Sequence, residues 1–226
     1  MSRFNVFNQI HKGLRAMLYD TALTLQQTHF DDSGQADATV KKVRTAVDIF
    51  ESHTAHEDHF ILPAIQQYEP SLADLFTMEH IKNHSLSEKL ADLLVVHNHA
   101  VKPEVKIEAG HAISQAFQQF MVYNLEHMSK EETVLNEILW RYYSDAEIES
   151  ISKRIVRSLR HDEETVTTAW MMRGLSNKEI SNWLKTVETT APAPVFAQLF
   201  SIAERELPHD RFRQVLEIFT EGTMVA

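Results

Sequence analysis

Apolar residues recur at intervals of three and four along most of the chain, which is the spacing of one face of an α-helix. The pattern predicts four long helical stretches, at 3–29, 37–68, 70–97 and 105–142. Turn-forming residues at 30–37 separate the first two stretches, and a loop at 97–104 separates the last two. Because short connections favour antiparallel neighbours, we predict an all-α fold with an up-down-up-down four-helix bundle.

The pattern changes after residue 143. Two capping boxes, each a Ser followed three residues later by a Glu, begin at Ser144 and Ser176. Helices are predicted at 145–173 and 177–189, and two shorter ones at 194–206 and 209–220. We therefore divide the chain into a bundle domain, 1–143, and a helical C-terminal extension, 144–226. The extension carries no evident chemistry, and its apolar positions suit either a cover over the bundle or an interface with a second copy or a protein partner.

Composition limits what the chain can bind. The formal net charge is -10, which disfavours nucleic acid and anionic membrane surfaces as partners. There is no Cys, so disulfides, thiolate metal ligands and Cys nucleophiles are excluded. No segment is long and apolar enough to span a bilayer, and the N-terminus lacks the apolar core of a signal peptide. We expect a cytoplasmic protein with neither nucleic-acid nor membrane partners.

Seven side chains of metal-ligand type lie on the apolar faces of the four predicted bundle helices. They are His11, His53, Glu57, His80, His84, His127 and Glu131. Three i, i+4 pairs among them place two side chains one turn apart on the same helix face. Any one of these residues alone is more often a core histidine or a surface ion pair. Two carboxylates on apolar faces without a nearby Lys or Arg need a compensating cation, so the whole set predicts a metal site in the bundle core.

The number and type of ligands narrow the choice of metal. Seven ligands exceed one tetrahedral zinc site and suit two five- or six-coordinate ions bridged by carboxylates. A nitrogen-rich, sulfur-free set fits iron and also accepts manganese, zinc or nickel. Ferritin-like proteins need a Glu-x-x-His motif on each of two bundle helices. Here that motif occurs only at Glu108–His111 and Glu206–His209, which do not converge.

Three further residues are predicted to lie around the ligands. His56 is one turn from His53 and rotated by about 60° on the helix. Tyr123 precedes His127 by one turn, either lining a pocket or filling the core, and Glu132 follows the last ligand. Glu132 or Tyr123 would be the proton source if the site turned over a substrate.

The ordered set of His, His-x-x-x-Glu, His-x-x-x-His and His-x-x-x-Glu resembles the hemerythrin-like (HHE cation-binding) family. The segments that carry the resemblance are FNQIHKGLR around His11, HTAHEDHFILPAI at 53–65, HIKNH at 80–84 and HMSKEETVL at 127–135. The resemblance covers about residues 3–142 and implies a four-helix bundle with two Fe ions, a non-haem di-iron centre with an oxo or hydroxo bridge. It implies that the five His are terminal ligands and that Glu57 and Glu131 are bridging carboxylates.

The last ligand departs from the pattern of the oxygen-carrying hemerythrins. Those proteins place an Asp five residues after the last His, where this chain has Glu132. We favour Glu131, because i+4 keeps a side chain on the face of His127 while i+5 rotates it by about 100°. The His-x-x-x-Glu form is similar to the bacterial HHE branch, which includes the repair-of-iron-centres proteins. Their usual Cys-containing N-terminal domain has no counterpart here.

Three hypotheses follow. The first is a non-haem di-iron protein that binds O2 or a related small ligand, NO or peroxide, for sensing, storage or stress response. The second is a di-iron enzyme with oxidase, peroxidase, NO-reducing or iron-centre repair activity. The third is a metal-dependent regulatory module that forms a homodimer or binds a partner through 144–226. The sequence leaves open whether the protein is an enzyme.

Overall fold

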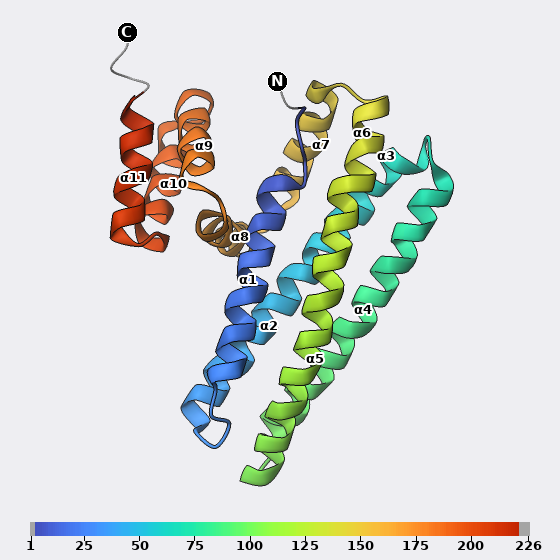
Figure 1. Ribbon diagram of the computed structural model, residues 1–226, viewed down its shortest axis with the longest axis vertical. Coiled ribbons are helices and arrows are strands. Elements are labelled where there is room, and N and C mark those ends of the chain that lie inside the picture. Colours follow the sequence, from blue (N-terminus) through green and yellow to red (C-terminus); the bar gives the residue numbers. More distant parts are fainter. Residues whose placement is uncertain (1–2, 222–226) are drawn as a thin grey trace. The chain divides into compact units, whose positions relative to one another are not determined.

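The computed structural model describes residues 3–221, and within that range the chain is helical without any strand (Figure 1). It divides into two compact units. The first, called here the long-helix unit, contains the described residues up to Asn8 and then Met17–Leu159. The second, the C-terminal unit, contains Gln9–Ala16 and the described residues from Arg160 onward. The all-α prediction is confirmed.

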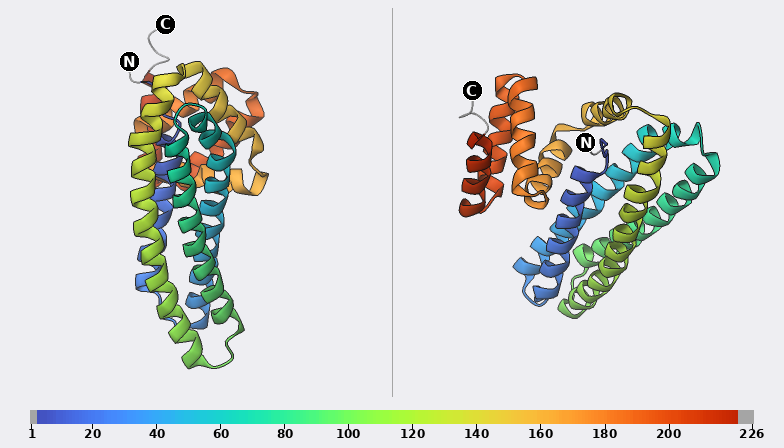
Figure 2. Two further views of the ribbon diagram at one scale, coloured as in Figure 1. Left: turned by 90° about the vertical axis from the view of Figure 1, so that its right-hand side faces the viewer. Right: turned by 45° about the horizontal axis from the view of Figure 1, so that its top comes forward.

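Four long helices correspond to the four predicted stretches: α1 (Asn8–Gln27), α2 (Ser33–His56), α4 (Pro70–His99) and α5 (Pro103–Lys130). Two of them continue through a short π-helical segment into a further α-helix. In this way α2 is followed by η1 (Glu57–Ile61) and α3 (Leu62–Gln66), and α5 by η2 (Glu131–Leu135) and α6 (Asn136–Tyr142). Within the long-helix unit, α4 lies alongside both α2 and α5 (Figures 1 and 2).

The helix α2 begins earlier than the sequence predicted, because a side chain caps its first turn. Residues 30–37 were expected to form a turn, but Asp32 caps α2 and the helix begins at Ser33. The Asp32 carboxylate accepts hydrogen bonds from the backbone N–H groups of Gly34 and Gln35, at 2.9 and 3.1 Å. These donors would otherwise lack partners in the first turn, so the cap stabilises the earlier start.

The predicted helix at 145–173 is wrong, because two helices replace it: α7 (Asp145–Ser158) and α8 (His161–Gly174). At the break, the Ser158 hydroxyl donates to the backbone carbonyl of Ile155, a local bond that competes with helix continuation. Acidic residues in the first turn of α8 then favour a new helix N-terminus. The division at 143/144 stays a prediction; the two compact units divide after Leu159, and α7 groups with the long-helix unit.

Each unit has its own apolar core. One core cluster of the long-helix unit lies where η1, α3, η2, α6 and α7 come together, and it contains Phe7, Ile61, Ile65, Phe76, Leu135, Ile138, Leu139 and Ile148. In the C-terminal unit, α8 packs with α9 (Asn177–Thr190), α10 (Ala193–Glu206) and α11 (His209–Glu221) around residues that include Met172, Ile180, Leu184, Ile202 and Val215. The capping boxes expected at Ser144 and Ser176 are both present. None of the described helices combines the length and apolarity that a bilayer crossing requires.

Candidate metal centre

Six of the seven predicted ligands come together in two overlapping groups that could hold metal ions. The first group is His11, His53, Glu57 and Glu131, and the second is Glu57, His80, His127 and Glu131. Within each group, one ligand atom from every residue lies within 4.8 Å of the others. Glu57 and Glu131 belong to both groups. Two groups that share two carboxylates form an arrangement suited to two ions with bridging carboxylates.

These residues are withdrawn from solvent. His11 and Glu131 are 0% exposed, Glu57 is 2%, His80 and His127 are 3%, and the side chain of His53 is 13% exposed. Ionised carboxylates at this depth are unfavourable unless a cation or a set of hydrogen bonds compensates them. Glu57 and Glu131 are thus buried, as the sequence pattern predicted, and they need such compensation.

Glu57 and Glu131 each begin a π-helical segment. The backbone N–H of Leu62 donates to the carbonyl of Glu57, and the N–H of Asn136 donates to the carbonyl of Glu131. Each bond closes a wider turn than an α-helix has, a distortion that is frequent at functional sites. The two His-x-x-x-Glu segments thus share the same backbone deviation at the same position. Sequence periodicity predicted helix at both places but did not predict the π-turns.

The imidazole Nε2 atoms face the shared carboxylates. His53 Nε2 lies 3.2 Å from Glu57 Oε1, and His127 Nε2 lies 2.9 Å from Glu131 Oε1. His80 Nε2 lies between the two carboxylates, 3.7 Å from Glu57 Oε2 and 3.6 Å from Glu131 Oε1. The Nε2 atoms of His80 and His127 are buried without a well-formed hydrogen bond. Buried nitrogen and carboxylate donors directed at one another fit a metal ion placed between them.

Two carboxylates outside the groups bind Nδ1, the other ring nitrogen, of His80 and His127. Asp58 Oδ1 lies 2.6 Å from His80 Nδ1, and Glu79 Oε2 lies 2.8 Å from His127 Nδ1. Lys130 in turn donates to Glu79 Oε1 at 2.6 Å. Such partners fix the ring orientation and leave Nε2 available as a ligand. Sequence reasoning missed Asp58 and Glu79, although each is the chain neighbour of a predicted ligand.

The metal-free site favours protonated imidazoles at two positions. Burial lowers the pKa of His80, but its hydrogen bond to Asp58 and its interactions with the carboxylates of Glu131 and Glu57 outweigh burial and raise the pKa to about 10. Burial also lowers the pKa of His127, and Glu131 and Glu79 again raise it above its usual value. Without a metal, both pKa shifts favour a protonated imidazole beside the shared carboxylates. Metal binding must therefore release protons from this site.

The structure does not bring His84 to either group. Its side chain is 60% exposed, and its Nδ1 lies 2.7 Å from Glu51 Oε2. The buried face of α4 continues from His80 through Asn83 and Ser87, and not through position 84. Both i+3 and i+4 lie near one helix face, and here the i+3 residue is the one that turns inward.

The three residues predicted around the ligands have different surroundings. His56 is half-buried and stacks against Phe60, with ring centroids 6.4 Å apart. Tyr123 stacks on His127 at 6.2 Å, and its hydroxyl donates to the backbone carbonyl of Glu79 at 2.7 Å. Burial and the nearby carboxylates raise the pKa of Tyr123 to about 12. Glu132 is half-buried and belongs to neither group.

A hydrogen-bonded polar layer lies one helical turn from the ligands. Asn124 Nδ2 donates to Asn83 Oδ1 at 2.8 Å and to the carbonyl of Phe120 at 2.9 Å. Asn83 Nδ2 donates to Thr54 Oγ1 at 3.2 Å. Thr54, Asn83 and Asn124 come from α2, α4 and α5. These three helices, with the segments η1 and η2 that continue two of them, carry five of the six ligands, so the layer joins the elements around the centre.

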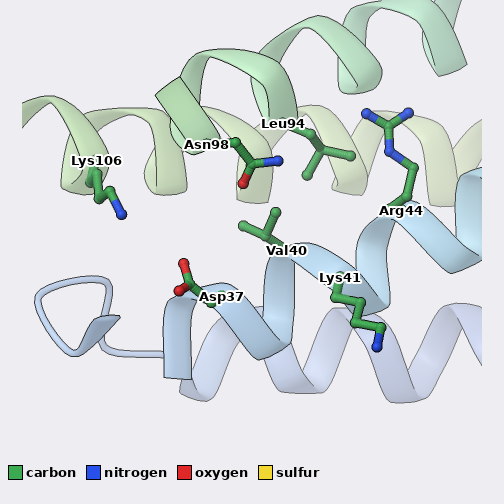
Figure 3. A pocket seen from close by; sticks show the side chains of 7 residues that line it. All are labelled: Asp37, Val40, Lys41, Arg44, Leu94, Asn98 and Lys106. Atoms are coloured by element: carbon green, nitrogen blue, oxygen red, sulfur yellow. The ribbon is translucent and has the colours of Figure 1, made fainter. Parts of the chain in front are cut away.

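A cavity of about 460 Å³ lies elsewhere in the long-helix unit. It is lined by Asp37, Val40, Lys41, Arg44, Leu94, Asn98 and Lys106 (Figure 3). None of these is a candidate metal ligand. In Figure 3 the Lys41 side chain points away from Asn98 and Asp37, so the basic groups do not converge on one ligand. The cavity and the metal centre are separate features.

This chain shows low sequence identity to the known proteins that it matches. The chain is similar to F-box/LRR-repeat protein 5 of Mus musculus, 23% identical over 177 residues, which covers 76% of this chain and 24% of that protein. It is 25% identical to the Xenopus laevis protein of the same name over 225 residues, 96% of this chain and 31% of that protein. The chain thus spans less than a third of the length of these relatives. No family model and no solved structure matches it.

Proposed function

We propose that this chain is a hemerythrin-like protein in which an up-down-up-down four-helix bundle holds two Fe ions and binds a small ligand such as O2, NO or peroxide reversibly. Sensing, storage or a stress response would be its cellular use. The observation that carries the proposal is that two four-residue groups share both Glu57 and Glu131. The ordered His and Glu motifs of the sequence support the same conclusion.

The donor count favours ligand binding. Each ion would receive two imidazoles and one oxygen from each shared carboxylate, which makes four protein donors. Iron in such nitrogen and oxygen sites commonly takes five or six donors, so positions remain for water and a small ligand. Because His84 lies outside the groups, more positions remain than seven ligands would leave. Bound iron would supply the electrons that a diatomic ligand takes up on binding.

The surrounding residues orient the ligands and limit proton supply. Asp58 and Glu79 hold Nδ1 of His80 and His127, which directs both Nε2 atoms inward. Tyr123 has a pKa of about 12 and its proton is engaged by a backbone carbonyl, so it is a poor acid at neutral pH. Reversible binding needs no proton donor, whereas reduction of O2 or peroxide does. Of the two proton sources that the enzyme hypothesis names, Tyr123 is therefore unsuited, and that hypothesis would depend on Glu132.

The test is iron uptake followed by ligand cycling. Purified protein loaded anaerobically with Fe(II) should retain about two Fe per chain, and air should produce new near-ultraviolet and visible absorption that disappears under vacuum. Repeated cycles without loss of amplitude would support reversible binding. Continuous consumption of O2 or NO over many turnovers would support the enzyme hypothesis instead. Absence of stoichiometric iron would contradict the proposed centre.

One observation favours a second candidate, a metal-dependent regulatory module. The α1 turn that carries His11 groups with the C-terminal unit. Within that unit, a Cβ on Gly13 would lie 2.9 Å from the Met171 backbone nitrogen, and Lys12 forms an ion pair with Glu179. This close packing would let a change in the ligation of His11 reach α8 and α9.

Hydrogen exchange tests the second candidate. Iron loading should increase the protection of backbone amides in α8 and α9 of the wild-type protein. The His11→Ala variant should lose this increase while it keeps its helical content. Equal protection of these helices with and without iron would contradict a regulatory link through α1.

A further inference from the structure

Asn136 is a buried amide without hydrogen-bond partners. It is 0% exposed, and neither its Nδ2 nor its Oδ1 is bonded to another protein group. A carboxamide offers two donors and an acceptor with two lone pairs, and leaving them unpaired in a protein interior is unfavourable. Unsatisfied groups of this kind in a native structure call for a partner such as water or a ligand.

The position of Asn136 relates this amide to the metal centre. Its backbone N–H donates to the carbonyl of Glu131, so it closes the π-turn that begins at that shared carboxylate. Side chains in a helix lean toward the N-terminus, which here is the direction of Glu131. Both residues are 0% exposed. Leu135, which precedes Asn136 in the chain, is an apolar residue of the core cluster and is also 0% exposed.

The matching position in the other π-containing segment has a different side chain. Leu62 closes the π-turn that begins at Glu57 through the same type of backbone bond, and it is an apolar residue that is 5% exposed. An apolar side chain therefore suits this position of the fold. The amide of Asn136 makes the Glu131 side of the centre different from the Glu57 side.

The other amides near the centre are already engaged. Asn83, Asn124 and Thr54 bond to one another one turn away from the ligands. Asn136, which closes the π-turn that begins at Glu131, has polar side-chain atoms that remain unused within the described chain. A small ligand at the Glu131 side of the centre would supply the missing partner.

We propose that Asn136 is a specificity-determining residue whose Nδ2–H donates a hydrogen bond to a small anionic or polar ligand at the metal centre. The inference rests on the proposed function, because it requires a loaded centre with an open position. Ligands whose outer atom accepts a hydrogen bond are favoured over ligands of the same size that do not accept one. Asn136 acts on the bound ligand and not on the retention of metal.

The test compares Asn136→Leu, which copies the side chain of Leu62, with wild-type protein. Azide is the probe, and its affinity for the oxidised, iron-loaded protein is measured by absorption titration. The variant should keep the wild-type iron content, while the azide dissociation constant rises about tenfold because one hydrogen bond to a charged ligand is lost. The metal-free variant should unfold at the same temperature or higher, since an apolar group replaces an unsatisfied amide.

Ser87→Ala is the matched control. Ser87 also has a buried oxygen without a hydrogen-bond partner, but it lies seven residues beyond His80, two turns along α4. This variant should leave the azide affinity unchanged. If it weakens azide as much as Asn136→Leu does, the effect belongs to the core in general and the inference is overturned.

Unchanged azide affinity in iron-loaded Asn136→Leu would overturn the inference by itself. If that variant loses iron, Asn136→Ala decides by the same criteria, because it removes the amide without adding bulk. Wild-type protein that takes up no iron would overturn the proposed function, and this inference with it. The two failures are distinguished by the iron content of the wild-type protein.

Discussion

The two π-containing segments, 53–65 and 127–139, repeat one design with different surroundings. Each has a His, then a Glu four residues later that begins a π-turn and belongs to both ligand groups. They differ beyond the ligands. Asn136 occupies the place of Leu62, and His127 is held by Glu79, whose other carboxylate oxygen accepts a hydrogen bond from Lys130. The repeated part serves metal binding, and the differing parts are where ligand preference and affinity can be adjusted separately.

The largest expected effect on iron uptake comes from Glu57 and Glu131, the one residue of each segment that belongs to both ligand groups. Glu57→Gln or Glu131→Gln should each abolish uptake of both ions, because an amide removes the charge and one bridging oxygen from both positions. His53→Ala or His127→Ala affects one group and should leave about one Fe per chain. Iron analysis after anaerobic loading gives the count.

Glu132→Gln is the control for these variants, because Glu132 is the neighbour of Glu131 and belongs to neither group. It should retain about two Fe per chain. Loss of only one ion in Glu131→Gln would contradict the shared role of that carboxylate.

A second comparison separates the two histidines of α4. His80→Ala should lose the ion of its group, while His84→Ala should keep both ions, because His84 is exposed and bonded to Glu51. Iron content and near-ultraviolet absorption measure the difference. Loss of iron in His84→Ala would restore the seven-ligand interpretation of the sequence and would require α4 to rotate on metal binding.

These residues show what could be predicted from the sequence. Helical spacing, the four long helices and the burial of Glu57 and Glu131 follow from short-range patterns. The inward turn of Asn83 in place of His84 does not, because i+3 and i+4 differ by only about 100° on a helix and tertiary packing selects between them. The π-turns and the Asp58 and Glu79 contacts depend on neighbouring helices, which periodicity does not describe.

The pH dependence of stability should separate metal-free from loaded protein. The folded pKa of His80 is about 10, against an ordinary value of 6.5, so protonation stabilises the metal-free fold. That stabilisation is fully present below 6.5 and is lost as pH rises toward 10. Urea unfolding should show a loss on the order of a few kcal/mol over this window.

Two comparisons control this measurement. Iron-loaded protein should not show the loss, because a ligating Nε2 carries no proton. Metal-free His80→Asn should also lack the His80 contribution. A flat profile in metal-free wild-type protein between pH 6.5 and 10 would contradict the protonated state of His80.

The smallest expected effect concerns the carboxylates that hold Nδ1. Glu79→Gln should weaken iron binding about tenfold to a hundredfold, the usual range for a lost ligand-orienting partner. Asp58→Asn should weaken it less, because the side chain of Asp58 is 48% exposed and that of Glu79 is 15% exposed, and an exposed contact is more easily replaced by water. Competition with a chelator of known affinity measures both. If Asp58→Asn weakened iron binding more than Glu79→Gln did, His80 would depend more on the carboxylate at its Nδ1 than His127 does. The difference between the two segments would then have to be traced to Asn136 alone.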